Sequence, residues 1–379
     1  MPNMLDYLTW RGDLPLACVP WNEVDSLLMA SLSYCSFGEQ AAGDVGVALR
    51  SLSPGPREDV KDFRFFNRCR DLEGALAQTL RFGGLMVHDA VELLEPLRQM
   101  QFAAMTIDLP DGDCFIAYRG TDSTLVGWRE NFAMAYDDAV PAQQEALTYL
   151  ERISLRHPRG IYLGGHSKGG NLAVFAAAHA SEPARRLLRG VYSFDGPGLS
   201  QKVLETPGYA SIHGLIRSYL PQSSVVGLLL GYHPEYTVVR AEAVSLLQHD
   251  PFTWQLTGPR FEEMQQVDAA SQLMDETLHE WLEHCTPMQR EAFVDAVFSI
   301  LEATGATTLS QIKDEKFRSV AAMVIAGLTL DSETKKMLIR LVAQFIRIGT
   351  TNLWERLRQR PLALRGRTDD AENEWEVES

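Results

Sequence analysis

Residues 161–175 constrain the fold of this chain more than any other stretch, and they read Ile-Tyr-Leu-Gly-Gly-His-Ser-Lys-Gly-Gly-Asn-Leu-Ala-Val-Phe. A short apolar run leads into Gly165-His166-Ser167-Lys168-Gly169, and an alanine-rich segment with helical character follows. The order strand, glycine-rich turn, helix predicts that Ser167 lies on a very tight turn with its hydroxyl exposed above a sheet.

The residue types around Ser167 suit a nucleophile. Glycines two before and two after the serine keep a tight turn free of side-chain clashes. The serine then lies at the amino end of a helix, where backbone N–H groups and the helix dipole favour developing negative charge. The backbone N–H of Lys168 is one expected oxyanion donor. The pattern is typical of the nucleophile elbow of the α/β-hydrolase fold.

The rest of the chain up to residue 260 alternates between strand-like and helix-like segments. This alternation predicts a mainly parallel sheet with helices on both faces. Pro110, Asp111 and Gly112 separate the first two strands, which we expect to form a hairpin. The predicted strands are 102–109, 114–119, 161–163, 191–194, 216–220 and 236–240, and the predicted helices are 22–36, 142–157 and 172–180.

The hydrophobic period changes to 3.6 residues after about residue 260, which predicts an all-helical C-terminal region. One helix is expected to begin at Thr286 with a capping box and to end at Gly305. Another is expected from Asp331 to Gly349. We therefore expect a catalytic domain over 1–260 with a loop or insertion at 38–60, a helical accessory or cap region over 261–355, and a disordered charged tail over 356–379.

Charge and cysteine content exclude several classes. The net charge of -15 argues against a nucleic-acid partner, since phosphate-binding proteins are usually basic. The five cysteines are scattered without a CxxC pair, which argues against a disulfide framework or a zinc-cysteine site. Neither a signal peptide nor a membrane-length apolar run is apparent, so a cytoplasmic location is expected. No metal or cofactor is implied.

A catalytic serine needs a base, usually a histidine oriented by a carboxylate. His249 lies in a loop nine residues past the strand 236–240, where this fold presents its base, and His233 is the alternative. Asp195 directly follows the strand 191–194 and is the preferred acid. Asp250 is a poorer candidate because adjacent side chains rarely point at one another.

Three motifs resemble the class 3 lipases. Tyr118-Arg-Gly-Thr-Asp122 with Gly127-Trp128 is similar to their R-G-T stretch, and Gly164–Gly170 to their G-H-S-x-G-G elbow. Phe194–Gly198 is similar to their strand-end F-G-x-P stretch. The N-terminal segment and the helical end resemble a bacterial, Mbeg-like branch of that group, and the lipase-like part covers about 85–255. The resemblance implies that the backbone N–H of Thr121, with or without its hydroxyl, is the second oxyanion donor.

One stretch departs from the lipase pattern. Class 3 lipases carry their catalytic aspartate in a D-x-V-P stretch, and the matching segment here is Leu220-Pro-Gln-Ser-Ser-Val-Val226, with serine in place of the aspartate. Two alternatives follow. Either Asp195 replaces the missing acid, or a Ser-His pair acts with help from Ser224.

These patterns together predict a serine hydrolase that cleaves carboxylic esters, lipase- or esterase-like, acting on a small acyl ester or a lipid. A non-catalytic binding or scaffold protein on the same fold is the rival interpretation, and a thioesterase, peptidase or lysophospholipase would carry the same elbow. The amphipathic helices after residue 260 leave peripheral membrane contact open. The oligomeric state is not predicted. Residues that either line an acyl pocket or belong to the core are Leu125, Val126, Val226, Leu228, Leu229 and Leu230.

Overall fold

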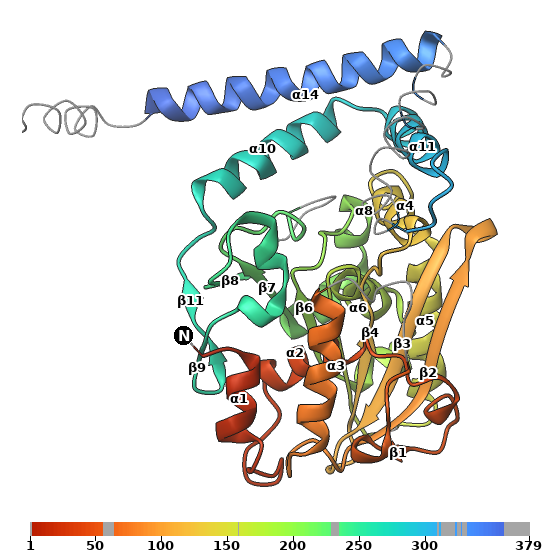
Figure 1. Ribbon diagram of the computed structural model, residues 1–379, viewed down its shortest axis with the longest axis vertical. Helices are drawn as coiled ribbons and strands as arrows, with labels where there is room; N and C mark the ends of the chain where they lie inside the picture. The colour runs from red at the N-terminus through yellow and green to blue at the C-terminus, as the bar shows by residue number, and fades with distance from the viewer. Residues whose placement is uncertain are drawn as a thin grey trace, which may run out of the picture.

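The computed structural model describes residues 2–55, 64–157, 159–228, 235–308 and 332–359, together with residues 311, 323 and 327. A nine-stranded sheet in the order β1-β2-β3-β4-β5-β6-β7-β8-β11 runs through the molecule (Figure 1). Its strands are β1 (Val47–Ala48), β2 (Met86–Glu95), β3 (Met100–Asp108), β4 (Cys114–Tyr118), β5 (Ile161–His166), β6 (Leu188–Phe194), β7 (Ile216–Pro221), β8 (Thr237–Val239) and β11 (Glu263–Met264). Strands β9 (Leu256–Thr257) and β10 (Arg260–Phe261) form a separate pair.

The centre of the sheet is parallel and its edges are antiparallel. Strands β4 to β8 run parallel to one another, whereas β1, β2, β3 and β11 pair antiparallel with their neighbours. With helices on both faces, this is the α/β-hydrolase fold. All six predicted strands are present, and β3 and β4 form the predicted hairpin. Strand β2 was not predicted, because its polar residues and a register shift between His88 and Val91 hide its period.

Helices cover the two faces of the sheet. They are α1 (Met4–Arg11), α2 (Glu23–Leu32), α3 (Arg64–Ala77), α4 (Leu125–Ala133), α5 (Pro141–Ser154), α6 (Lys168–His179), α7 (Glu182–Leu187), α8 (Gln201–Leu204) and α9 (Pro207–Ile212). The three helices predicted in this part correspond to α2, α5 and α6. The predicted loop over 38–60 contains β1 and two short 3-10 turns, and its residues 56–60 lie outside the described part of the chain.

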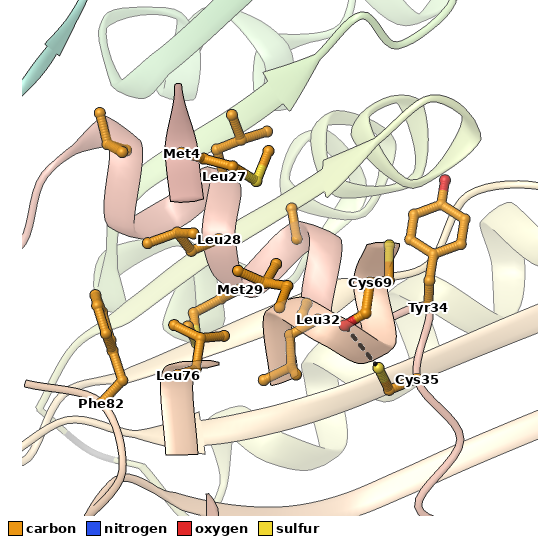
Figure 2. Close-up of a cluster of buried hydrophobic side chains, with 14 of the residues drawn as sticks. Met4, Leu27, Leu28, Met29, Leu32, Tyr34, Cys35, Cys69, Leu76 and Phe82 are labelled. Carbon is orange, nitrogen blue, oxygen red and sulfur yellow. Dashed lines mark hydrogen bonds between the residues drawn. The ribbon is translucent and has the colours of Figure 1, made fainter. Parts of the chain in front are cut away.

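Strand β4 shows how the sheet divides the core in two. Phe115 and Ala117 belong to the cluster formed with α1, α2 and α3, whereas Cys114, Ile116 and Tyr118 belong to the cluster with α5 and α6. Successive side chains of a strand point to opposite faces, so a strand covered on both sides is apolar throughout. Figure 2 shows the first cluster, in which α2 packs with α3 and the Cys35 thiol donates to the Cys69 carbonyl oxygen, 3.4 Å away.

The C-terminal helices are α10 (Ala269–Glu283), α11 (Pro287–Glu302) and α14 (Ser332–Gln359). Helix α11 begins with the predicted capping box at Thr286 and ends at Glu302, just before Gly305. The predicted cap Asp331 lies outside the described residues. The predicted end of the last helix at Gly349 is wrong, because α14 continues to Gln359.

Gly349 allows a close approach between helices and does not end one. Helices α10 and α14 lie side by side (Figure 1), and the indole N–H of Trp281 donates to the Leu341 carbonyl oxygen at 2.9 Å. A methyl group on Gly349 would lie 3.3 Å from the Thr277 methyl of α10. No helix among the described residues combines the length and apolarity needed to cross a bilayer.

Candidate active site

Ser167 lies on a strained turn between β5 and α6. Its φ of 57° and ψ of -132° are a conformation that residues with a side chain rarely adopt. A hydrogen bond fixes this turn to the end of β6, because the Ser167 N–H donates to the Phe194 carbonyl oxygen at 2.9 Å. Ser167 is 7% exposed, so little of its surface meets solvent.

The glycines on either side of Ser167 are required by the turn. A methyl group on Gly165 would lie 2.2 Å from the carbonyl carbon of Gly169. One on Gly169 would lie 2.1 Å from the Tyr118 carbonyl oxygen. Both contacts are with backbone that cannot move aside, which explains in this structure why the motif has glycine at each position.

His249 and Asp195 form a tight pair beside the elbow. His249 ends a 3-10 turn (Ser245–His249), and its Nδ1 lies 2.6 Å from Asp195 Oδ2. Asp195 follows β6 directly, is fully buried and has a φ of 49°. A methyl group on the next residue, Gly196, would lie 2.9 Å from the Ser167 carbonyl oxygen, so this turn lies against the elbow.

The pair has a defined tautomer. A carboxylate only accepts hydrogen bonds, so the Nδ1–H of His249 donates to Asp195 and Nε2 is the basic nitrogen. The imidazole also packs against that of His166, the residue before Ser167, with ring centroids 4.5 Å apart and an interplanar angle of 34°. The structure thus brings Ser167, Asp195 and His249 into one neighbourhood from three separate segments.

The second carboxylate oxygen of Asp195 is also bound. Ser224 Oγ donates to Asp195 Oδ1 at 2.5 Å, and the Gly227 N–H donates to the same oxygen at 3.1 Å. Gly227 has no room for a side chain, because a methyl group there would lie 2.5 Å from that oxygen. The two alternatives left by the sequence therefore involve one site, in which Asp195 follows β6 and Ser224 donates a hydrogen bond to it.

The other candidates lie elsewhere. Asp250 accepts from Arg68 at 2.9 Å and caps a 3-10 turn through the Phe252 N–H at 3.0 Å, so its carboxylate is engaged away from His249. His233 lies outside the described residues.

The segment that carries Thr121 lies directly beside Ser167. A methyl group on Gly120 would lie 3.0 Å from the Ser167 Cβ and 2.6 Å from the His166 carbonyl oxygen. The Thr121 hydroxyl accepts from the Asn131 side chain at 2.5 Å, which holds it toward α4. The hydroxyl only accepts in that bond and keeps its own O–H, so the backbone N–H and the hydroxyl of Thr121 are both donors that suit an oxyanion.

Lys168 has a backbone N–H that the sequence predicted to matter and a side chain whose role it did not predict. It is the first residue of α6, and an N–H in the first turn of a helix has no acceptor within that helix. The sequence predicted no role for the Lys168 side chain, which is fully buried. Lys168 Nζ donates to the carbonyl and side-chain oxygens of Gln101 at 2.5 and 2.8 Å, and to Glu130 at 3.0 Å.

His166 is a second residue whose role the sequence did not reveal. Its Nδ1 lies 3.0 Å from the Tyr34 hydroxyl, and its Nε2 lies 2.7 Å from the His249 carbonyl oxygen. Burial lowers the pKa of His166 well below its ordinary value and raises that of Tyr34. A neutral His166 therefore donates to His249 and accepts from Tyr34. Tyr34 lies 132 residues from His166, so only the tertiary contact could show this link.

The apolar residues that either line an acyl pocket or belong to the core differ in their burial. Leu125 and Leu228 are buried, at 3% and 5% exposed, while Val126 and Val226 are half-buried. Leu229 and Leu230 lie outside the described residues.

The C-terminal region contacts the segment next to Thr121. The Leu125 N–H donates to the Thr307 carbonyl oxygen at 2.9 Å, beside a backbone bridge between Thr124 and Thr308. Arg129 of α4 pairs with two acids of α11, Asp295 at 2.6 Å and Glu302 at 3.1 Å. The region after residue 261 is therefore attached close to the candidate site.

Comparison with known proteins gives a family and a structural neighbour. A family model described as Mbeg1-like matches residues 76–299, which are 224 of the 379 residues. No curated protein sequence matches the chain. A solved structure described as a crystal structure of M37 lipase is similar with a TM-score of 0.37 and 14% identity. That match covers 55% of this chain and 70% of the other.

Proposed function

The chain belongs to the Mbeg1-like family, and from its site we propose that it is a serine hydrolase that cleaves carboxylic esters through an acyl-enzyme on Ser167. The observation that carries the proposal is the 2.6 Å pair of His249 and buried Asp195 beside a serine on a strained strand-to-helix turn. A nucleophile, a base and an orienting acid in one place are the requirements of acyl transfer.

The reaction proceeds in two halves. His249 Nε2 takes the proton of the Ser167 hydroxyl as Oγ attacks the acyl carbonyl. The N–H groups of Thr121 and Lys168 stabilise the oxyanion, and losing one such donor typically costs about 100-fold or more in rate. His249 returns the proton to the leaving alkoxide, and water then releases the acid by the reverse sequence. Asp195 holds the tautomer and stabilises the imidazolium.

The substrate class is an acyl ester, small or lipid-derived. The likeness of the R-G-T segment to class 3 lipases supports an ester over an amide, whereas the elbow alone does not separate the two.

Hydrolysis of p-nitrophenyl esters from acetyl to palmitoyl tests the proposal, with Ser167→Ala and His249→Ala as comparisons. We expect turnover by the wild type and a loss of at least about 1,000-fold in either variant. Covalent labelling of Ser167 by a fluorophosphonate is the independent readout. The opposite outcome is a wild-type protein that hydrolyses no ester or thioester and is not labelled by the fluorophosphonate. A binding protein on this fold would then be the leading interpretation.

A further inference from the structure

A second cluster of chemically active side chains lies on β2, β3 and the segment after α5. His88, Asp108 and His157 each offer one ligand atom, and these three atoms lie within 4.8 Å of one another. Asp108 Oδ1 lies 3.1 Å from His88 Nε2 and 3.7 Å from His157 Nδ1. The two imidazole rings are stacked, with an interplanar angle of 16° and centroids 5.5 Å apart.

This cluster is separate from the candidate active site. Asp108 pairs with Cys114 at the start of β4, and Cys114 pairs with Ile161 at the start of β5. Ser167 follows the other end of β5, six residues further on, which is about 20 Å along a strand. The cluster therefore lies at the amino end of the parallel strands, opposite the nucleophile.

The side chains around the ring of His88 are anionic on both sides. Its Nδ1 lies 2.9 Å from Asp89 Oδ2 and its Nε2 lies 3.1 Å from Asp108 Oδ1, so carboxylate oxygens face both ring nitrogens. A neutral imidazole has one N–H and satisfies only one of them. Either a second proton, which gives an imidazolium with two N–H donors, or a metal ion between Nε2 and Asp108 satisfies both carboxylates. Only the metal ion also engages His157, whose Nδ1 lies 3.7 Å from Asp108 Oδ1.

Asp89 is arranged as a supporting residue for such a ligand. It is 2% exposed, has a φ of 51° at the register shift of β2, and accepts from Arg152 and Arg156 at 2.9 Å each. Metal-binding histidines almost always donate their other ring N–H to a carboxylate, a carbonyl or a water that fixes the ring. Asp89 therefore leaves Nε2 of His88 directed at Asp108.

We propose that His88, Asp108 and His157 bind a divalent transition-metal ion of the zinc type, with water in the fourth position. Two imidazoles and one carboxylate form a recurrent donor set for Zn²⁺, whose tetrahedral ligands lie about 3.4 Å apart at bond lengths of 2.0–2.1 Å. The 3.1 and 3.7 Å separations bracket that value. The side chain of Asp108 is 38% exposed, which gives the ion a path from solvent. Bound there, it would join the β2–β3 edge to the segment after α5.

The test measures Zn²⁺ binding to the full chain after treatment with a chelator, by calorimetric titration, with Co²⁺ absorption as the check on geometry. We expect one site in the wild type that is weakened more than about 100-fold by His157→Gln and by Asp108→Asn, and about 10-fold by Asp89→Asn. The surface variant His284→Gln is the matched control and keeps wild-type affinity.

Thermal unfolding shows whether each variant is folded, and it gives a second readout that does not depend on ester turnover. Saturating Zn²⁺ should raise the Tm of the wild type and of His284→Gln, because a ligand that binds only the folded state stabilises it, and should leave that of His157→Gln unchanged. Wild-type protein that binds no Zn²⁺ at micromolar concentration overturns the proposal. So do folded His157→Gln and Asp108→Asn variants with undiminished affinity.

Discussion

Lys168 and Glu130 form an ion pair, with 3.0 Å between Nζ and Oε2, in which neither side chain is more than 1% exposed. The pair joins the first residue of the helix behind the nucleophile to α4, the helix that follows Thr121. Every oxygen of Glu130 is used, since Oε2 also accepts from the Gln101 N–H at 3.0 Å and Oε1 from the Ala142 N–H at 2.8 Å. The Lys168 ammonium group thus has three acceptors, and both oxygens of the Glu130 carboxylate accept hydrogen bonds.

Breaking one half of this pair should destabilise the fold strongly. In Lys168→Met the Glu130 carboxylate is left buried without its cation, which typically costs about 3–5 kcal/mol. The double variant Lys168→Met/Glu130→Leu should lose less than the single one, because no lone charge remains. Urea unfolding of these proteins measures both effects. Lys202→Met, which removes an exposed pair with Asp138, is the control and should change stability by less than about 0.5 kcal/mol.

Removing the hydrogen bond from Ser224 to Asp195 should slow ester hydrolysis without affecting substrate binding. A hydrogen bond to a charged group contributes about 1.5–3 kcal/mol, so Ser224→Ala should lower kcat by about 10- to 100-fold at constant KM. Ser223→Ala is the matched control, since that hydroxyl donates to Asp268 instead, and should hydrolyse esters at the wild-type rate. Equal effects of the two serine substitutions would contradict this role for Ser224.

Asparagine at position 195 should affect the tautomer of His249 and leave the fold nearly intact. Ser224 and Gly227 donate to Oδ1, so the amide oxygen remains on that side and the NH2 group faces Nδ1. The proton of the imidazole then moves to Nε2, and the base is blocked. By analogy with serine proteases, we expect kcat/KM to fall by about 10,000-fold in Asp195→Asn. The variant should still unfold cooperatively in a thermal scan. Near-normal turnover would show that the histidine acts without this acid.

The glycines of the elbow should not tolerate even a methyl group. Gly169→Ala would place a Cβ 2.1 Å from the Tyr118 carbonyl oxygen, so we expect little or no folded protein by circular dichroism. Gly74→Ala in α3 meets nothing within 4 Å and should stabilise the protein by about 0.5–1 kcal/mol. Full folding of Gly169→Ala would mean that the turn relaxes more easily than this geometry allows.

His166 should make the stability of the fold depend on pH. Burial holds its folded pKa well below 6.5, so between that pKa and 6.5 the unfolded chain binds a proton that the folded chain does not. Its contribution is fully present above pH 6.5 and is lost as the pH falls below it, by up to about 1.4 kcal/mol per pH unit. Unfolding free energies of wild type and His166→Gln between pH 5 and 8 test this. The slope should flatten in His166→Gln and persist in His284→Gln.

The sequence indicated much of the site because its signals are local. The elbow is a run of five residues whose glycines are each required by backbone clashes, so the motif carries its own structure. The position of Asp195 at a strand end and the loop that carries His249 could be inferred for the same reason. Strand β2 could not, because its bulge at His88 breaks the alternation on which strand prediction depends.

Other features depend on partners far away along the chain. Glycine often follows the last residue of a helix, which is why the sequence predicted a helix end at Gly349. It lies within α14 instead, where the lack of a side chain lets Thr277 of α10 pack closely against it. The buried ammonium group of Lys168 meets residues 38 and 67 positions away, and no spacing rule links them. Likewise Tyr34 and His166 are related only through the folded core.

The sequence by itself determined the tight turn at Ser167, the parallel sheet that supports it and the candidate residues, because each depends on backbone conformation and hydrophobic period over a few residues. Only the tertiary structure decided that Asp195 pairs with His249 while Ser224 binds its other oxygen. It alone also placed the side chain of Lys168 in a buried ion pair. A buried polar group is stable only when its partners reach it, and those partners arrive from distant segments once the chain has folded.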